Sequence, residues 1–262
     1  MIFLFAILGL AVGSFLNVCI DRLPRNESIV NPPSHCPVCQ QKLAAKDLIP
    51  VFSYLRLRGR CLYCQAAIPR RLFWVELATA VIFALFCWWF VVVNPENSEL
   101  GIVTFGVLAF YACLFTIIFV VDLEHGLILN KVVYPAMVVA LLLALYPSPW
   151  LGETMVMRVA YSALGGAIGF AIFLLIVIVS RGGMGWGDVK LAALVGLATG
   201  FPLVILAVIM AAILGGIAAV ALLIAKKRKR RQTIPFGPFL SVAAMITLLW
   251  GSNIVTWYLG LM

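Results

Sequence analysis

Residues 203–225 read LVILAVIMAAILGGIAAVALLIA, a run without a single charged side chain. Crossing the hydrocarbon core of a bilayer takes about 20 consecutive apolar residues in a helix, and this run is long enough. The rest of the chain has the same character, because 64% of its 262 residues are hydrophobic and only 11% are charged. A water-soluble domain of this size needs far more polar surface. The sequence therefore predicts an all-α protein that crosses a membrane several times.

We expect about eight transmembrane helices. Their ranges are 2–20, 73–93, 101–121, 132–147, 157–180, 189–199, 203–225 and 237–260. The first is interpreted as a retained helix, since it lacks the basic start of a signal peptide. A single helix over 189–225 would be about 55 Å long, so we place a break at the Gly200-Phe201-Pro202 segment. The predicted domains are the first helix (1–20), a loop domain (21–72) and a seven-helix domain (73–262).

Lys and Arg residues gather in alternate connections between these helices. The chain has 19 of them, and all except Arg158 lie in residues 21–72, 122–131, 181–190 and 226–236. Because cytoplasmic connections are enriched in Lys and Arg, we expect these four segments inside and the N-terminus outside. The net charge of +9 then reflects membrane orientation and gives no reason to expect nucleic-acid binding. The basic run Lys226–Arg231 is interpreted as an anchor on anionic lipid.

The loop domain contains two Cys-x2-Cys pairs. Each pair presents two thiolates from a tight turn, and two pairs complete a closed tetrahedral site. We therefore predict a structural metal site, with zinc as the expected ion and iron as its chemical rival. Two disulfides are the alternative, which a reducing cytosol disfavours. The expected ligands are Cys36, Cys39, Cys61 and Cys64, and the cysteines interpreted as packing residues are Cys19, Cys87 and Cys113.

Two aspartates stand at helix ends that face the same side of the membrane. Asp122 follows the third predicted span directly, and Asp188 precedes the sixth. Either residue alone could be an ordinary helix-end charge. Two carboxyls in contact, however, share one proton, so that one activates water while the other polarises a scissile carbonyl. Such a pair suits the hydrolysis of a peptide bond, and we expect Gly185 and Gly187 to let an extended substrate backbone approach it.

Several further motifs are spread along the chain: Gly13–Val18, Ser34–Cys39, Arg58–Cys61, Val75–Leu77, Gly183–Leu191 and Ile234–Phe239. Taken together, they resemble the motifs of the bacterial type IV prepilin peptidases, GxGD-type aspartic proteases that are usually also N-methyltransferases. The resemblance covers nearly the whole chain. It implies catalytic roles for Asp122 and Asp188 and metal roles for the four cysteines. It also implies an inner-membrane enzyme that cleaves prepilins or pseudopilins with a basic leader after a glycine, at the cytoplasmic face, and methylates the new N-terminus with S-adenosylmethionine.

The chain departs from the family pattern in two places. Leu129 stands where the family commonly has proline, and Gln40 and Gln65 stand where each cysteine knuckle frequently has glycine. A residue other than glycine can still turn, so the metal prediction is kept. The first departure concerns only the connection after Asp122.

Some questions stay open at this point. The chain could be a peptidase without methyltransferase activity, or a transporter whose paired carboxylates carry protons or cations. No Gly-x-Gly fingerprint of a Rossmann methyltransferase is present, so the S-adenosylmethionine site is unknown. The Gly165–Gly169 step predicts close helix packing, with dimerisation as the alternative. Acidic residues that could attract a basic leader are Glu27, Glu76 and Glu124.

Overall fold

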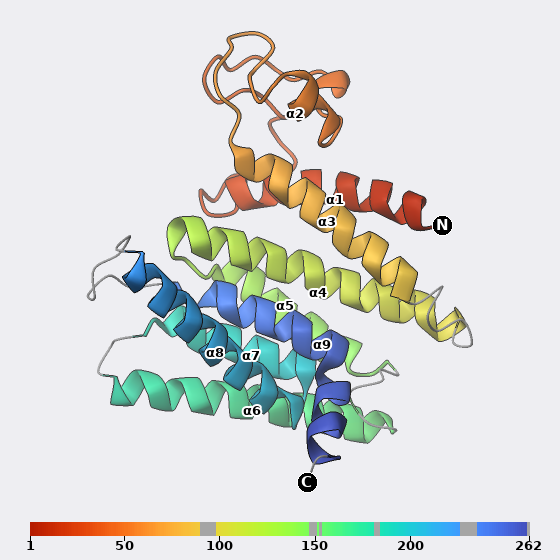
Figure 1. The fold of residues 1–262 in the computed structure, drawn as a ribbon, viewed down its shortest axis with the longest axis vertical. Helices are drawn as coiled ribbons and strands as arrows, with labels where there is room; N and C mark the ends of the chain where they lie inside the picture. Colours follow the sequence, from red (N-terminus) through yellow and green to blue (C-terminus); the bar gives the residue numbers. More distant parts are fainter. Residues whose placement is uncertain (90–97, 147–150, 152–153, 181–183, 226–234, 261–262) are drawn as a thin grey trace. The chain divides into compact units, whose positions relative to one another are not determined.

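The computed structural model describes residues 1–89, 98–146, 151, 154–180, 184–225 and 235–260 (Figure 1). Within these ranges the regular structure is helical, apart from two isolated bridges. The helices are α1 (Ile2–Arg22), η1 (Ala45–Asp47), α2 (Phe52–Arg56), α3 (Arg70–Trp88), α4 (Ser98–His125), α5 (Asn130–Leu143), α6 (Met155–Val179), α7 (Trp186–Thr199), α8 (Leu203–Ile224) and α9 (Gly237–Leu259). The chain forms two compact units, residues 1–117 and 118–262. The three-part division into 1–20, 21–72 and 73–262 stays a prediction.

Among the residues that the structure describes, six helices are long and apolar enough to cross a membrane. They are Ile2–Arg22, Arg70–Trp88, Val103–His125, Met155–Val179, Leu203–Ile224 and Gly237–Tyr258. The predicted spans 132–147 and 189–199 correspond to α5 and α7, which have 14 residues each. A helix of that length extends about 21 Å, less than the hydrocarbon thickness. The predicted fold class, a polytopic all-α membrane protein of about eight helices, is confirmed, with two of the helices short.

In the first unit α1 packs along α3, and glycines on α1 allow the contact. A Cβ on Gly13 would lie 2.7 Å from the Cα of Glu76, closer than side chains tolerate. One turn further on, the Asn17 side chain donates a hydrogen bond to the Leu72 carbonyl at 3.0 Å. The predicted Gly13–Val18 and Val75–Leu77 motifs are therefore two sides of one helix contact. Cys19 and Cys87 are buried in the same helices, which confirms that they are packing residues.

In the second unit α7 is the central helix, in contact with α5, α6, α8 and α9. A Cβ on Gly165 would overlap the Gly196 carbonyl oxygen, and one on Gly169 would overlap the Ala192 carbonyl oxygen. The predicted close packing at the Gly165–Gly169 step is thus confirmed within the chain. Helix α7 ends where Gly200 adopts a φ of +71°, so the predicted break before α8 is also confirmed. The basic run Lys226–Arg231 lies outside the described residues.

Candidate functional site

The four predicted metal ligands come together in the first unit. The Sγ atoms of all four cysteines lie within 4.8 Å of one another. The Cys36 and Cys64 sulfurs are 3.8 Å apart, far beyond the roughly 2.05 Å of a disulfide. Ligands about 2.3 Å from a tetrahedral zinc ion lie about 3.8 Å from each other, so the cluster fits the predicted closed metal site.

The two knuckles have the same backbone turn. In the first, the amide of Gln40 donates to the Cys36 carbonyl at 2.8 Å, and in the second the amide of Gln65 donates to the Cys61 carbonyl at 3.0 Å. Both glutamines have a positive φ, 57° and 60°. This left-handed conformation explains why glycine is frequent at these positions, since glycine adopts it at no steric cost. The chain keeps the turn without glycine, and the metal site keeps its geometry.

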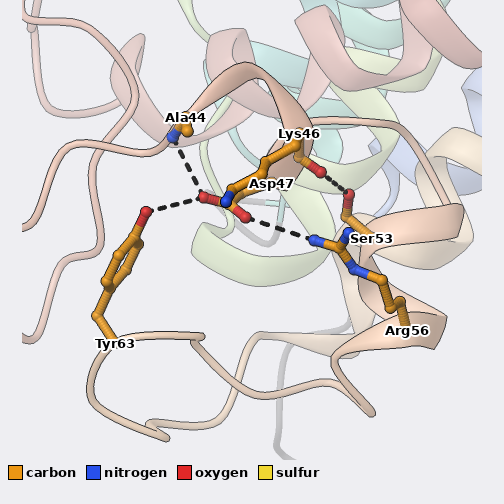
Figure 2. A network of polar contacts seen from close by, with 6 residues as sticks. All are labelled: Ala44, Lys46, Asp47, Ser53, Arg56 and Tyr63. Carbon is orange, nitrogen blue, oxygen red and sulfur yellow. Dashed lines mark hydrogen bonds and ion pairs between the residues drawn. The ribbon is translucent and has the colours of Figure 1, made fainter.

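Asp47 links the second knuckle to the rest of the loop domain (Figure 2). Its Oδ2 atom accepts hydrogen bonds from the Tyr63 hydroxyl at 3.1 Å and from the Ala44 amide at 3.2 Å. Its Oδ1 atom lies 3.6 Å from the guanidinium of Arg56 on α2. The carboxylate thereby joins the knuckle that carries Tyr63 to η1 and α2.

Glu76 connects the loop domain to the helices of the first unit. Its Oε2 atom accepts a hydrogen bond from the Val51 amide at 2.7 Å, and the side chain also hydrogen-bonds to Ser14. The residue is only 8% exposed. Glu76 therefore has a structural position, whereas Glu27 and Glu124, the other residues considered for attracting a basic leader, are exposed.

Asp122 lies in the second unit, in the last turn of α4. Its helix continues to His125, four residues beyond the predicted span of 101–121, so the aspartate is inside the helix rather than after it. Asp122 is only 4% exposed, and its Oδ2 atom accepts a hydrogen bond from the amide of Gly237 at 2.9 Å. Because Gly237 is the first residue of α9, the carboxylate interacts with the positive end of that helix.

Gly237 is a site residue that the sequence interpretation missed. A Cβ at this position would lie 2.6 Å from Asp122 Oδ2, so any other residue would displace the carboxylate from its present position. The residue belongs to the Ile234–Phe239 motif, which was noted only as a resemblance. A glycine followed by proline at a helix start was the available signal, but its partner lies 115 residues earlier in the chain.

Asp188 lies in the first turn of α7, ahead of the predicted span 189–199. Burial raises the pKa of its carboxyl group to about 6, the negative charge of Asp122 adds to the increase, and a backbone hydrogen bond from Gly185 opposes it. The two aspartates are thus close enough to interact electrostatically, although they come from different helices. One protonated and one ionised carboxyl can coexist in such a pair near neutral pH.

The two glycines before Asp188 have different surroundings. A Cβ on Gly185 would meet only ordinary contacts, the nearest at 3.7 Å from Asp188 Oδ2, and this glycine is exposed. A Cβ on Gly187 would lie 2.9 Å from the Cβ of Ile128, in the connection after α4. Gly187 therefore allows α7 to pack against that connection, while Gly185 borders open space beside the carboxyl group.

Lys190 fixes the start of α5 against α7, a contact that the sequence interpretation also missed. Its Nζ atom donates to Asn130 Oδ1 at 3.0 Å and lies 5.3 Å from the ring centre of Tyr134. Both partners belong to the first turns of α5. Leu129, where the family commonly has proline, immediately precedes this helix, and the pairing with Lys190 is made without the proline.

Two families match the chain, one over each part. Residues 7–90 match the bacterial peptidase A24 N-terminal domain, and residues 108–220 match the type IV leader peptidase family. Curated relatives named prepilin leader peptidase/N-methyltransferase cover nearly the whole chain. The relative from Pseudomonas aeruginosa is 31% identical over 97% of this chain and 91% of its own length. The relative from Aeromonas salmonicida is 31% identical over 99% of this chain and 93% of its own length. The relative from Bacillus subtilis is 29% identical over 97% of this chain and 96% of its own length.

No solved structure matches the chain significantly. The similarity to the curated relatives extends over both units of the chain. The chain belongs to the type IV leader peptidase family.

Proposed function

We propose that this protein is a prepilin leader peptidase and N-methyltransferase of the bacterial inner membrane. Asp122 and Asp188 hydrolyse the peptide bond after a glycine that ends a short basic leader. The new N-terminal residue is then methylated with S-adenosylmethionine as the donor. The names of the relatives support this substrate and both activities.

The observation that carries the peptidase proposal is that two carboxyl groups from different helices come together: Asp122 is buried and bound by the Gly237 amide, and Asp188 lies near enough to sense its charge. Burial and this charge raise the pKa of Asp188 to about 6. An aspartate that only ended a helix in water would ionise at its ordinary value near 3.8. The pair instead keeps one proton within reach of neutral pH. Asp122 and Asp188 can then exchange the roles of general base and general acid during hydrolysis.

Hydrolysis depends on the proton that the two carboxyl groups share. The ionised carboxylate takes a proton from a water molecule, which attacks the scissile carbonyl carbon. The protonated carboxyl donates a hydrogen bond to the carbonyl oxygen and stabilises the charge that develops there. The proton taken from water is then passed to the leaving amine as the peptide bond breaks. Open space beside Gly185 leaves room for an extended substrate backbone, which supports its predicted role in substrate binding.

The four cysteines bind zinc as a structural ion. Zinc bound by four thiolates has no open position for substrate, so it cross-links the loop domain and takes no part in hydrolysis. Cys36 and Cys39 supply one half of the site, and Cys61 and Cys64 the other. The Asp47 interactions then connect the cross-linked knuckles to α2 (Figure 2).

The N-terminus lies outside and the aspartate pair lies at the cytoplasmic face. The distribution of Lys and Arg supports this orientation, since only Arg158, near the start of the fifth predicted span, lies toward the outside. A cytoplasmic active site agrees with a basic leader, because leaders of that kind stay on the cytoplasmic side of the membrane.

Purified full-length protein in nanodiscs, incubated with a prepilin, tests the proposal. Mass spectrometry of the product N-terminus, with and without S-adenosylmethionine, reports cleavage and methylation together. Asp122→Asn and Asp188→Asn should each lower the cleavage rate by about 10²–10⁴-fold. Asp21→Asn is the matched control, because this aspartate also directly follows a predicted span but pairs with Arg71 at 2.6 Å in the first unit. Full cleavage by either aspartate variant would refute the pair, and cleavage without methylation would refute the second activity alone.

A further inference from the structure

Helix α2 of the loop domain exposes large apolar side chains on one side. Phe52 and Leu55, three residues apart and therefore on one helix face, are 58% and 59% exposed. Leu48 and Ile49, just before the helix, are also exposed. We call these four residues the α2 apolar face. An exposed apolar cluster on a small metal-stapled loop needs a partner that shields it from water.

The polar side of α2 is held against the rest of the first unit (Figure 2). The Ser53 hydroxyl donates to the Lys46 carbonyl at 2.8 Å, and the Arg56 guanidinium pairs with Asp47. Tyr54 packs on Phe73 of α3, with ring centres 5.4 Å apart. These contacts fix the rotation of α2, so the apolar face points away from the loop domain and is not free to fold back into it.

The hydrogen bond between the Val51 amide and Glu76 determines how far along the axis of α3, counted from its first residue, the start of α2 is held. Helix α3 begins at Arg70, and Glu76 lies six residues further, about 9 Å along the axis. Glutamate side chains lean toward the N-terminus of their helix, which shortens this depth by a few ångströms. The headgroup zone on each side of a bilayer is roughly 5–8 Å thick. If Arg70 lies among the headgroups, then Val51 and the start of α2 lie near the boundary with the hydrocarbon.

Two further features of the same region match a membrane interface. Trp74 is 62% exposed in the first turns of α3 and packs against Phe73, which places two aromatic rings at this level. Trp and Tyr are enriched where membrane spans meet water. The loop domain also carries many more Lys and Arg than acidic residues, with exposed examples at Arg58, Arg60 and Arg70. Such an excess favours anionic lipid headgroups.

We propose that α2 lies in the surface of the membrane, with Ile49, Phe52 and Leu55 inserted between phospholipids. The loop domain is then held on the bilayer at three points: by the ends of α1 and α3, through which it is covalently tethered, and by the α2 apolar face between them. The partner is lipid because the tethers and the Val51–Glu76 hydrogen bond hold this face at the level where lipid is the surrounding medium. The inference rests on the membrane fold and does not depend on the peptidase proposal.

Photolabelling of the unmodified full chain tests this inference. The protein is placed in nanodiscs of phosphatidylethanolamine and phosphatidylglycerol that contain a phospholipid with a diazirine in its acyl chain near the headgroup. After illumination, lipid adducts are mapped by mass spectrometry. We expect the peptide that contains residues 48–56 to be labelled several-fold more than the peptide around Val38, a 69% exposed apolar residue of the first knuckle.

A double substitution sharpens the test. The double variant Phe52→Glu/Leu55→Glu should reduce the labelling of residues 48–56 several-fold. Val38→Glu should leave the labelling of these residues unchanged. Zinc content, measured in every sample, shows that the loop domain remains folded. Absence of label on residues 48–56 of the native chain, or equal label on both loop peptides, would overturn the inference. That result would mean that lipid does not cover the α2 apolar face.

Discussion

Gly237→Ala would place a methyl group against the carboxylate of Asp122. The added Cβ would lie 2.6 Å from Asp122 Oδ2 and 3.0 Å from its carboxyl carbon, whereas ordinary contacts begin at 3.4 Å. Because the backbone of Gly237 also donates a hydrogen bond to the same oxygen, the carboxylate cannot move away without losing this bond. A retreat of ~1 Å relieves the overlap, and misplacement by that distance costs about 10²-fold in rate.

The variant should nevertheless fold. Position 237 is the first residue of α9 and precedes Pro238, where a Cβ is disfavoured, but this strain is confined to the end of the helix and leaves the rest of α9 in place. Gly216→Ala in α8 is the matched control, because nothing lies within 4 Å of the added Cβ. We expect Gly216→Ala to keep full cleavage with equal or slightly higher thermal stability.

The assay compares kcat/KM for a prepilin with the melting temperature of the same preparation. Loss of cleavage in Gly237→Ala with an unchanged melting temperature would support the contact between Gly237 and Asp122. Wild-type cleavage by Gly237→Ala would refute the reasoning, because an undisturbed rate is incompatible with a catalytic carboxylate displaced by ~1 Å. An equal loss in Gly216→Ala would attribute the effect to helix flexibility.

Three other predictions concern the aspartate pair and the metal. First, kcat/KM should fall as the pH rises through about 6, because Asp188 then loses the proton that the pair shares; a profile that stays flat from pH 5 to 8 would contradict this. Second, Asp188→Asn should raise the melting temperature when it is measured at a pH well above 6, and should leave it unchanged when it is measured near pH 4. The raised pKa means that protonation stabilises the fold fully below the ordinary value of 3.8, and that this stabilisation is lost as the pH rises through about 6. The shift of about 2 pH units sets an upper limit of about 3 kcal/mol; equal melting temperatures at both pH values would contradict the prediction. Third, a strong zinc chelator should remove one metal ion per chain and make residues 34–68 sensitive to protease; unchanged protease resistance of a metal-free sample would contradict a structural role for the metal.

Most of the fold follows from sequence patterns that act locally. Apolar length predicts the membrane helices, and Cys-x2-Cys spacing predicts the metal ligands, because both depend on residues near each other in the chain. The lengths of α5 and α7 were less predictable, since a short helix in a bundle is defined by its neighbours. Helix α7 is buried along most of its length, so hydrophobicity alone could not separate it from a lipid-facing span.

The sequence patterns could not predict contacts between residues that are far apart in the chain. The positive-inside rule indicated that Asp122 and Asp188 share a membrane face, which is a statement about helix ends and not about side chains. It could not reveal that the amide of Gly237 binds Asp122, or that Lys190 binds Asn130. Glu76 was considered as a site for the basic leader because it is acidic, yet its carboxylate holds Val51. Charge predicts attraction, but only the fold identifies the partner.

The glycines explain how the second unit can position its carboxyl groups. Lipid tails are as apolar as leucine, so helices in a bilayer gain little from hydrophobic burial and associate through close packing. Gly165, Gly169 and Gly196 bring the backbones of α6 and α7 into contact, and Gly187 brings the start of α7 against Ile128. Each of these contacts restrains the helix that carries Asp188, as Gly237 restrains Asp122. The contacts of Gly165, Gly169 and Gly196 are with backbone atoms, which have no rotamers to change, so the position of α7 and of the aspartate that it carries is set largely by the helix framework.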